Sequence, residues 1–246
     1  MLDYNEEATV YDATRGGLPR AEAAAAAVLG LVPDTARSLL DVGCGTGLVT
    51  GRIAAGRPGL RVTGSDAAHG MAVVARQRVG AVVLADARRL PLPDAAVDAV
   101  SAVWLLHLLR EPGAVRAVVA EAARVLRPGG VFVTTVDKDA AHDVGSDIDA
   151  AFAPYLAPTP ADGTDLVVAH AAEGGLNVAG DACFTGHGQG RSPVSAAHGV
   201  RRGYYTSRLV LPGDAAEELV RSLAALPDQD RRRADPEYRL LAFRRG

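Results

Sequence analysis

The string Asp41-Val42-Gly43-Cys44-Gly45-Thr46-Gly47 constrains the fold of this chain more than any other stretch. It follows an apolar run that begins at Ser38, and it precedes a stretch that is compatible with a helix. Glycines let the backbone turn sharply and approach a ligand, because no Cβ stands in the way. A strand, a glycine turn and a helix in this order predict a nucleotide-binding arrangement.

The spacing of these glycines differs from the dinucleotide fingerprint, which needs G-x-G-x-x-G. In the register that starts at Gly43 the last required glycine is Leu48, and from Gly45 it is Thr50. The chain also lacks a Tyr-x-x-x-Lys pair, since Lys138 is its only lysine. A nicotinamide oxidoreductase is therefore the second choice among enzymes.

Composition limits the class of protein and its partners. The 246 residues are 48% hydrophobic, which is enough for a large core, and the net charge of −3 provides no basic field for nucleic acid. The polar, acidic N-terminus is no signal peptide, and the apolar stretch at 23–32 is too short to span a bilayer. We expect a cytoplasmic protein without a membrane segment. Cys44 and Cys183 give neither a disulfide framework nor metal-ligand spacing, so no metal is expected.

Short apolar strands alternate with helices through the first half of the chain. The expected strands are 38–42, 61–65, 81–84, 97–103 and 131–136, and the expected helices between them are 48–55, 69–79 and 113–126. Arg127-Pro128-Gly129-Gly130 reads as a turn. Alternation of this kind predicts an α/β fold with a parallel sheet that helices cover on both faces.

The rest of the chain flanks this core. A polar N-terminal arm precedes an alanine-rich helix from Pro19 to about Gly30. After Asp137 the pattern changes; helices are expected at 165–173, 193–202 and 214–226, and strands at 177–186 and 237–244. We predict one domain with an arm and helix at 1–36, a core at 37–137, a substrate-shaping cap at 138–235 and a last strand at 236–246.

Two acidic residues follow the glycine turn at strand ends. Asp66 comes nineteen residues after Gly47, where a carboxylate can accept both hydroxyl hydrogens of a ribose. Asp86 ends the third strand, and the fourth strand leads from Asp94 to Trp104. Asp41 either organises the turn or accepts from the ligand, and the two roles can coexist.

Together these motifs resemble class I S-adenosylmethionine (SAM) dependent methyltransferases of the broad small-molecule kind, methyltransferase type 11-like. The resemblance covers residues 38 to 136 and includes the Arg124-to-Val131 helix, turn and strand. It implies a Rossmann-like, doubly wound, mostly parallel seven-stranded sheet with an antiparallel last strand. It also implies SAM as the cofactor, S-adenosylhomocysteine (SAH) as the product, and an inserted cap after the fifth strand.

The resemblance assigns roles to individual residues. Asp86 would accept from the adenine amino group while the backbone N–H of Ala87 donates to the ring, and Tyr11 and Arg15 of the arm would close over the cofactor. A planar guanidinium suits the SAM carboxylate. The full set of expected cofactor-binding residues is Tyr11, Arg15, Asp41, Gly43, Cys44, Gly45, Gly47, Asp66, Ala67, Met71, Asp86, Ala87, Ala102 and Val103.

We expect methyl transfer to an oxygen or nitrogen of a small-molecule acceptor, in secondary metabolism. A hydroxyl acceptor needs a base, and His107, just past the fourth strand, is the candidate catalytic residue because it would face the methyl position. The alternative is a histidine that lines this loop. His142 and His187 are expected to be structural.

Two other classes remain. A nucleic-acid methyltransferase is disfavoured, because Ser101-Ala102-Val103-Trp104 stands where an Asn/Asp-Pro-Pro-Tyr/Phe string would hold a flipped base. A non-methylating SAM-binding protein, or the same fold used for another reaction such as cyclisation, stays open. The acceptor molecule and the oligomeric state do not follow from the sequence.

Overall fold

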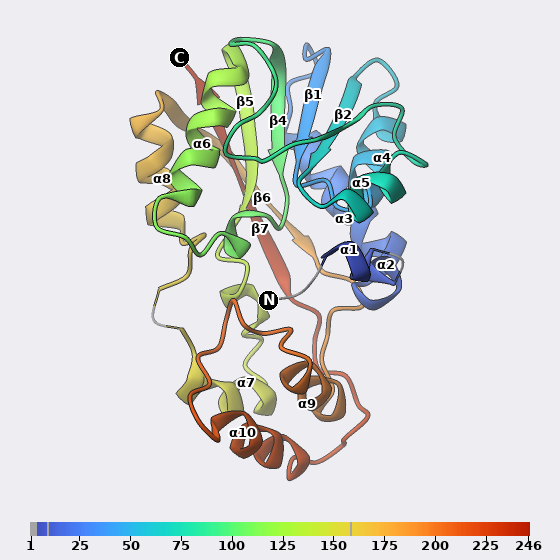
Figure 1. The fold of residues 1–246 in the computed structure, drawn as a ribbon, viewed down its shortest axis with the longest axis vertical. Helices are drawn as coiled ribbons and strands as arrows, with labels where there is room; N and C mark the ends of the chain where they lie inside the picture. Colours follow the sequence, from blue (N-terminus) through green and yellow to red (C-terminus); the bar gives the residue numbers. More distant parts are fainter. Residues whose placement is uncertain (1–3, 9, 158) are drawn as a thin grey trace.

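A seven-stranded sheet organises the upper part of the molecule in Figure 1. The computed structural model describes residues 4–8, 10–157 and 159–246. The strand order is β3-β2-β1-β4-β5-β7-β6, and β7 runs antiparallel to both β5 and β6. The strands are β1 (Ser38–Val42), β2 (Arg61–Asp66), β3 (Val82–Leu84), β4 (Val97–Ala102), β5 (Leu126–Val136), β6 (Leu176–Thr185) and β7 (Glu237–Arg245). The predicted doubly wound, mostly parallel sheet with an antiparallel last strand is confirmed.

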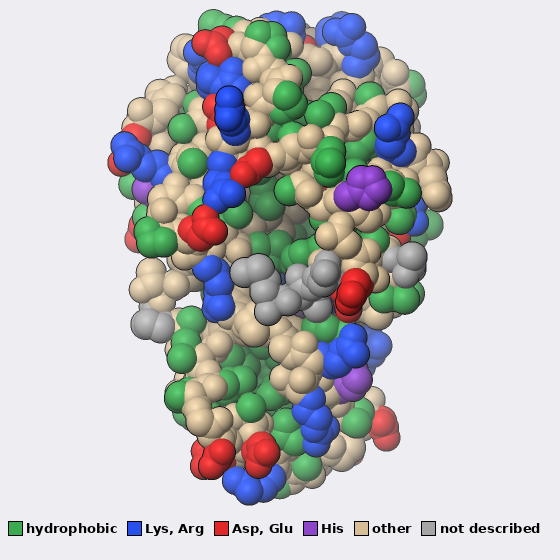
Figure 2. Space-filling model, in the orientation of Figure 1, with side chains coloured by type: hydrophobic (Ala, Val, Ile, Leu, Met, Phe, Trp, Pro, Cys, Tyr) green, Lys and Arg blue, Asp and Glu red, His purple; other side chains and the backbone are tan. Residues whose placement is uncertain are grey.

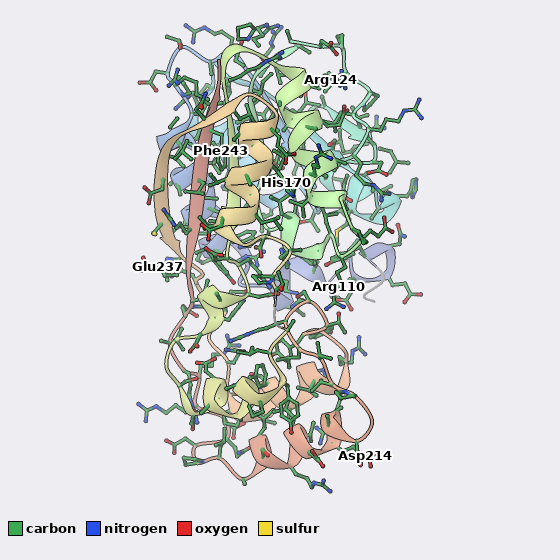
Figure 3. All side chains as sticks on the ribbon, turned by 90° about the vertical axis from the view of Figure 1, so that its left-hand side faces the viewer. Arg110, Arg124, His170, Asp214, Glu237 and Phe243 are labelled. Atoms are coloured by element: carbon green, nitrogen blue, oxygen red, sulfur yellow. The ribbon has the colours of Figure 1, made fainter. Side chains whose placement is uncertain are left out.

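Helices cover both faces of the sheet because successive side chains of a strand point to opposite faces. Leu39 packs in the cluster that holds α3 (Gly17–Leu31) and α4 (Leu48–Gly56). Its neighbour Leu40 packs in the cluster that holds α6 (Ala114–Val125) and α8 (Thr164–Glu173). Figure 3 looks toward the α6 and α8 face, and α5 (His69–Ala75) lies beside β2 and β3. Both faces of the central strands are therefore buried, as their apolar sequences predict.

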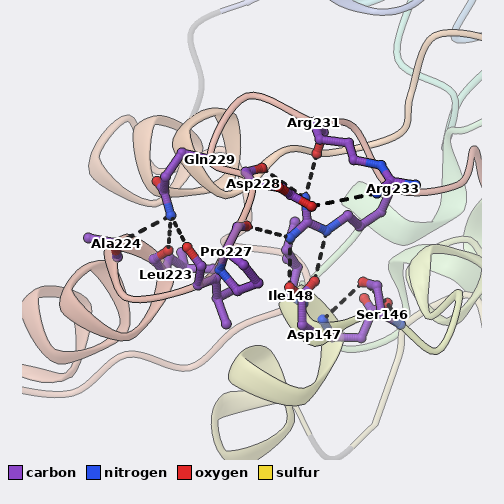
Figure 4. Close-up of polar contacts among 12 residues, drawn as sticks. Ser146, Asp147, Ile148, Leu223, Ala224, Pro227, Asp228, Gln229, Arg231 and Arg233 are labelled. Carbon is purple, nitrogen blue, oxygen red and sulfur yellow. Dashed lines mark hydrogen bonds and ion pairs between the residues drawn. The ribbon is translucent and has the colours of Figure 1, made fainter.

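A separate helical unit forms the lower part of Figure 1. It consists of α7 (Asp147–Phe152), the 3₁₀ turn η3 (Ala153–Tyr155), α9 (Pro193–Arg201) and α10 (Ala215–Ala224), with a core of its own that includes Phe152. Figure 4 shows how the last part of this unit is bonded to its first helix: Arg233 donates to Asp147, at the start of α7, at 2.8 and 2.6 Å. Gln229 donates to the backbone oxygens of Leu223 and Leu226 at the end of α10, at 3.0 and 2.7 Å.

The expected cap at 138–235 is divided in the structure. Its middle part belongs to the main layers, because Val167 and Ala171 of α8 are fully buried in the α6 cluster and β6 pairs with β7 along its length. The helical unit is thus made from two segments, 139–162 and 186–235, on either side of α8 and β6. The expected boundaries did not separate these parts, because α8 and β6 lie between the two segments of the helical unit in the sequence.

The expected turn at Arg127–Gly130 is instead a bulge inside β5. Residue pairing with β4 passes from Leu126 to Val131 while β4 advances only from Val97 to Ala99. Pro128 has no N–H to donate, and Gly129 adopts a φ of +78°, so the ladder is interrupted there. Among the residues that the structure describes, no helix is both long and apolar enough to cross a bilayer.

Two short helices, α1 (Tyr4–Glu7) and α2 (Tyr11–Thr14), form the N-terminal arm. The 3₁₀ turns η1 (Leu106–Leu108) and η2 (Ala140–His142) follow β4 and β5. All four segments come near the carboxyl ends of the parallel strands, which is where open α/β sheets bind their ligands. Figure 2 shows hydrophobic side chains inside a hollow near the middle of this face of the molecule.

Candidate functional site

The glycine turn between β1 and α4 is held against β2. The backbone N–H groups of Gly43 and Cys44 both donate to the carbonyl oxygen of Ser65, at 2.8 and 2.9 Å. Gly45 has a φ of +56°, and a Cβ built on it would meet no atom within 4 Å. A side chain at Gly45 would therefore be strained and would enter open space, so the turn leaves room for a ligand at this point.

Two carboxylates, Asp66 and Asp41, hold the glycine turn and its neighbouring elements in place. Asp66 accepts from the backbone N–H groups of Gly45 and Ala68, both at 2.8 Å. Asp41 accepts from the hydroxyls of Thr50 at 2.5 Å and Ser101 at 2.7 Å. Burial raises the pKa of Asp41 to about 6 although both hydroxyls oppose the shift, and burial likewise raises the pKa of Asp66. Asp41 thus joins β1, α4 and β4, which supports the turn-organising role.

A cavity of about 400 Å³ lies over the carboxyl ends of β1, β2 and β4. Most of the sequence-predicted cofactor residues line it together: Tyr11, Arg15, Asp41, Gly43, Cys44, Gly45, Asp66, Ala67, Met71, Asp86, Ala87 and Val103. They come from the arm, from the ends of four different strands and, for Met71, from α5. The fold therefore brings residues from position 11 to position 103 into one wall.

One end of the cavity carries an ion-pair chain that the sequence reading missed. Arg88 binds both carboxylate oxygens of Asp86, at 3.0 Å through Nε and 2.8 Å through Nη2, and binds Glu111 at 2.6 Å. The Arg88 hydrogen bond holds the pKa of Asp86 below its usual value. Asp86 is therefore ionised and oriented before any ligand arrives. The two residues are close in the sequence, and this short spacing is the signal that could have predicted the ion pair between Asp86 and Arg88.

The N-terminal arm closes the opposite side of the cavity. Asp12 of α2 accepts from Thr46 of the glycine turn and from Arg78, both at 2.6 Å. The guanidinium carbon of Arg15 lies 5.7 Å from the ring centre of Tyr11 and 4.7 Å from that of Tyr204, which lies beyond α9. The arm thus contacts both the sheet layer and the helical unit. The hydrogen bonds of Asp12 to Thr46 and Arg78 form a latch between the arm and the glycine turn, and the sequence motifs did not predict it.

Trp104 is a further wall residue that had no assigned role. It directly follows the fourth strand and adopts a φ of +55°, which is unusual for a bulky side chain. Its backbone N–H donates to Thr135 Oγ1 at 2.6 Å, and its ring packs edge-on against Phe184 and Tyr238, with centres 5.5 and 5.4 Å away. The surrounding contacts hold this strained residue in the cavity wall, as is common at functional sites.

Gly47 and Ala102 require a correction, since neither lines the cavity. Gly47 precedes α4 with a φ of +74°, and a Cβ there would lie only 3.0 Å from Ala75. Ala102 is fully buried in the α6 cluster beneath the wall. Both residues support the site by close packing rather than by facing a ligand.

His107 also lies elsewhere than expected. It does not line the main cavity, but a neighbouring one of about 370 Å³, whose wall includes Arg110 and His170, labelled in Figure 3. η1 turns its side chain into the interior, where it is 8% exposed and where Nδ1 finds no partner among the described residues. Burial, reinforced by the charge of Lys138, lowers its pKa well below the usual value, so the imidazole is neutral.

The other histidines differ in their surroundings. His142 Nε2 lies 3.0 Å from the hydroxyl of Tyr238, and burial lowers its pKa strongly as well. His187 lies in the loop after β6, where its backbone N–H donates to Thr185. Neither lines the main cavity.

Comparison with known proteins places these residues in a family. Residues 40–134 match the model of a methyltransferase domain. The malonyl-[acyl-carrier protein] O-methyltransferase of Serratia marcescens is 44% identical over 97 residues, 39% of this chain and 36% of that protein. The ubiquinone/menaquinone biosynthesis C-methyltransferase of Methylobacterium nodulans is 37% identical over 132 residues, 50% of this chain and 51% of that protein. The chain thus spans about half, or less, of the curated relatives it matches.

Solved structures extend the likeness to the whole fold. The [4+2]-cyclase SpnF superposes with a TM-score of 0.62 at 20% identity, over 98% of this chain and 93% of that one. The geranyl diphosphate C-methyltransferase of Streptomyces coelicolor A3(2), solved with S-adenosyl-L-homocysteine, gives 0.55 at 16% identity, over 100% and 85%. At these identities the likeness concerns the fold.

The residues present fit SAM, the cofactor of this family. Gly45 leaves open space over the turn, and Asp66 keeps lone pairs for ribose hydroxyls after accepting two backbone hydrogen bonds. The sheet, the matched domain and this wall lead to one conclusion: residues 40–134 form a methyltransferase domain of the class I SAM-dependent kind.

Proposed function

We propose that this protein transfers the methyl group of SAM to an oxygen or nitrogen of a small-molecule acceptor, in secondary metabolism. The observation that carries the proposal is that Asp41, the glycine turn, Asp66 and Asp86 line one cavity, inside a chain whose residues 40–134 match a methyltransferase domain. A cytoplasmic location and a substrate-shaping role for the helical unit are parts of the same proposal.

Each end of the cavity would hold a different part of the cofactor. The glycine turn and Arg15 would take the amino-acid end, Asp66 the ribose hydroxyls, and Asp86 with the N–H of Ala87 the adenine edge. Asp66 and Asp86 suit these tasks because backbone N–H groups fix the first and Arg88 fixes the second. A preformed wall of this kind costs little reorganisation when the ligand binds.

SAM supplies a methyl group on a positively charged sulfur, and transfer is an in-line displacement by the acceptor. The protein's main task is then to hold the reacting atoms about 3 Å apart and collinear. Val103 and Trp104 form the wall beside the expected methyl position, and the latched arm limits access of water from the other side.

Deprotonation of the acceptor is the least constrained step. His107 stays the candidate base, but it lines the neighbouring cavity, which adjoins the main one at Leu109–Glu111. Its neutral imidazole can accept a proton, although a strongly lowered pKa makes it a weak base. If the acceptor is already ionised when it binds, no base is needed.

The test has two steps. Calorimetry with SAM and SAH should give one site per chain, and binding of neither would remove the proposal. The bound protein should then transfer labelled methyl from SAM to an acceptor in a small-molecule extract. Since the names of the two relatives above include an O- and a C-methyltransferase, the product analysis must cover carbon as well. Binding without transfer would favour a non-methylating SAM-binding protein.

A further inference from the structure

Two arginines line the end of the cavity where the acceptor must approach, and this inference rests on the function proposed above. Arg15 follows α2, and Arg20 lies in the first turns of α3. Neither forms an ion pair with any carboxylate among the described residues. The amino-acid end of SAM has a single carboxylate, which Arg15 already suits, so Arg20 is left without a carboxylate partner in the proposed complex.

The contacts of Arg20 orient it toward the methyl position. Its guanidinium carbon lies 3.9 Å from the ring centre of Trp104, the wall residue that follows β4. Nη1 makes a long hydrogen bond of 3.4 Å to the side-chain oxygen of Gln189. Nε is buried and has no hydrogen-bond partner among the described residues. The planar group over the indole is therefore fixed in place, while its Nε and Nη2 edge has no acceptor among the side chains and backbone groups that the structure describes.

An unpaired guanidinium edge in such a place is costly unless a ligand uses it. A buried donor without an acceptor loses its hydrogen bonds to water and gains none in return, and the loss is larger for a charged group. The Nε and Nη2 edge matches the two oxygens of a carboxylate, and charge-assisted pairs of this kind are the strong ones. Stacking on an indole also orients the guanidinium for in-plane recognition.

Two buried arginines behind this wall share one carboxylate. Arg191 and Arg208 are 8% and 6% exposed, and both contact the one carboxylate of Asp149, at 2.6 and 3.6 Å. Each leaves its Nη1 buried without a partner in the part of the chain that the structure describes. These two guanidinium groups therefore keep N–H donors that suit an anionic ligand, although Asp139 and Asp143 also act on the charge of Arg208.

We propose that Arg20, stacked on Trp104, is the acceptor-recognition residue of this protein, and that its acceptor is a small molecule carrying a carboxylate near the atom to be methylated. The carboxylate lies against the Nε and Nη2 edge of Arg20. The methylated atom then lies beside Val103 and Trp104, within reach of the cofactor's methyl. Arg20 positions the acceptor and takes no part in bond formation.

The single tryptophan of the chain makes this testable without knowing the acceptor. SAH-saturated protein is titrated with benzoate and malonate, and in parallel with benzamide and malonamide, while Trp104 fluorescence is followed. We expect saturable quenching by the acids and an affinity at least about tenfold weaker for the amides, the difference that one charge-assisted pair provides. Arg20→Gln should abolish the preference for acids, and Arg20→Lys should retain part of it.

Matched variants separate this inference from the proposed function. Arg15→Gln should weaken SAH binding and keep the preference for acids, whereas Arg20→Gln should leave SAH affinity within about twofold, well under 1 kcal/mol. Equal responses to acids and amides, or a preference that survives Arg20→Gln, would overturn the inference. A loss of SAH affinity in Arg20→Gln equal to that in Arg15→Gln would make Arg20 a cofactor residue and also overturn it. Failure of the wild-type protein to bind SAH would instead refute the proposed function.

Discussion

At the scale of single residues, the cavity wall depends on carboxylates that are fixed before a ligand arrives. Asp66 is held by two backbone N–H groups and Asp86 by Arg88, so each oxygen has a defined direction. Asp41 is different: it is 3% exposed and satisfied by two hydroxyls. The three acids therefore respond differently to substitution.

Asp66→Asn should weaken SAH binding by about 10- to 100-fold, because hydrogen bonds to an ionised group contribute about 1.5–3 kcal/mol. Calorimetry measures the change. Asp34→Asn, at a fully exposed side chain on the surface, is the matched control and should bind like the wild type. Unchanged affinity in Asp66→Asn would remove the ribose assignment.

Asp41 should make stability fall as the pH rises. Burial raises its pKa to about 6 in the folded protein, above the unfolded value, so its stabilising effect is complete at low pH and is lost between about pH 4 and 6. The asparagine of the Asp41→Asn variant cannot titrate. Between about pH 4 and 6 the variant's free energy of unfolding should therefore rise by up to about 3 kcal/mol relative to that of the wild type. Urea denaturation at several pH values checks this. A difference that does not vary with pH would contradict it.

His107→Asn distinguishes a base from a lining residue. Because the structure places His107 outside the main cavity, we expect unchanged SAH affinity and a turnover within about fivefold of the wild type. Loss of a general base would lower turnover by about 100-fold or more and would abolish its pH dependence. A drop of that size would identify His107 as the general base.

At the scale of elements, the N-terminal arm is a closure over the cavity. α1 and α2 are four residues each, too short to be stable alone, so their position depends on contacts with the rest of the protein. The principal contacts are Asp12 with Thr46 and Arg78, while Glu7 lies 3.6 Å from Arg202 after α9. Cofactor exchange should therefore require release of the latch at Asp12.

Asp12→Asn should speed SAH release by about 3- to 10-fold with little change in the association rate, since a partly buried ion pair is lost from the closed state. Stopped-flow fluorescence of Trp104 measures both rates. Glu6→Gln, at an exposed position on α1, is the control. Equal release rates for the two variants would argue against the latch.

Many element boundaries were predictable in both halves of the chain, because strand apolarity, glycine turns and helix patterns agree there, although α5 ends four residues and β5 begins five residues before the expected position. β1 coincides with the expected 38–42, and α8, α9, β6 and β7 differ from expectation by one residue at one or both ends. The α7 helix was missed because its six residues, which include Asp147 and Asp149, have little apolar periodicity. Its Ser146 and Asp149 capping box was the signal that could have located it.

At the scale of the whole molecule, most of the cofactor wall followed from sequence because it is made of motifs at strand ends. The acceptor side did not, because it is assembled from distant segments: Arg20 on α3, Trp104 after β4 and Gln189 after β6 meet only in three dimensions. Gly47 and Ala102 do not line the cavity, since adjacency to a motif does not distinguish a wall residue from one buried behind it.

The most direct test of the central claim, that this cavity binds SAM through the glycine turn, is calorimetric titration with SAH of the wild-type protein and of Gly45→Val. A side chain at Gly45 would fill the open space where the ligand should lie. The account predicts one site per chain in the wild type and a loss of affinity of at least about 100-fold in Gly45→Val, with its thermal unfolding still cooperative. Binding of SAH that is equal in both proteins, or binding of NAD in place of SAH, would contradict it.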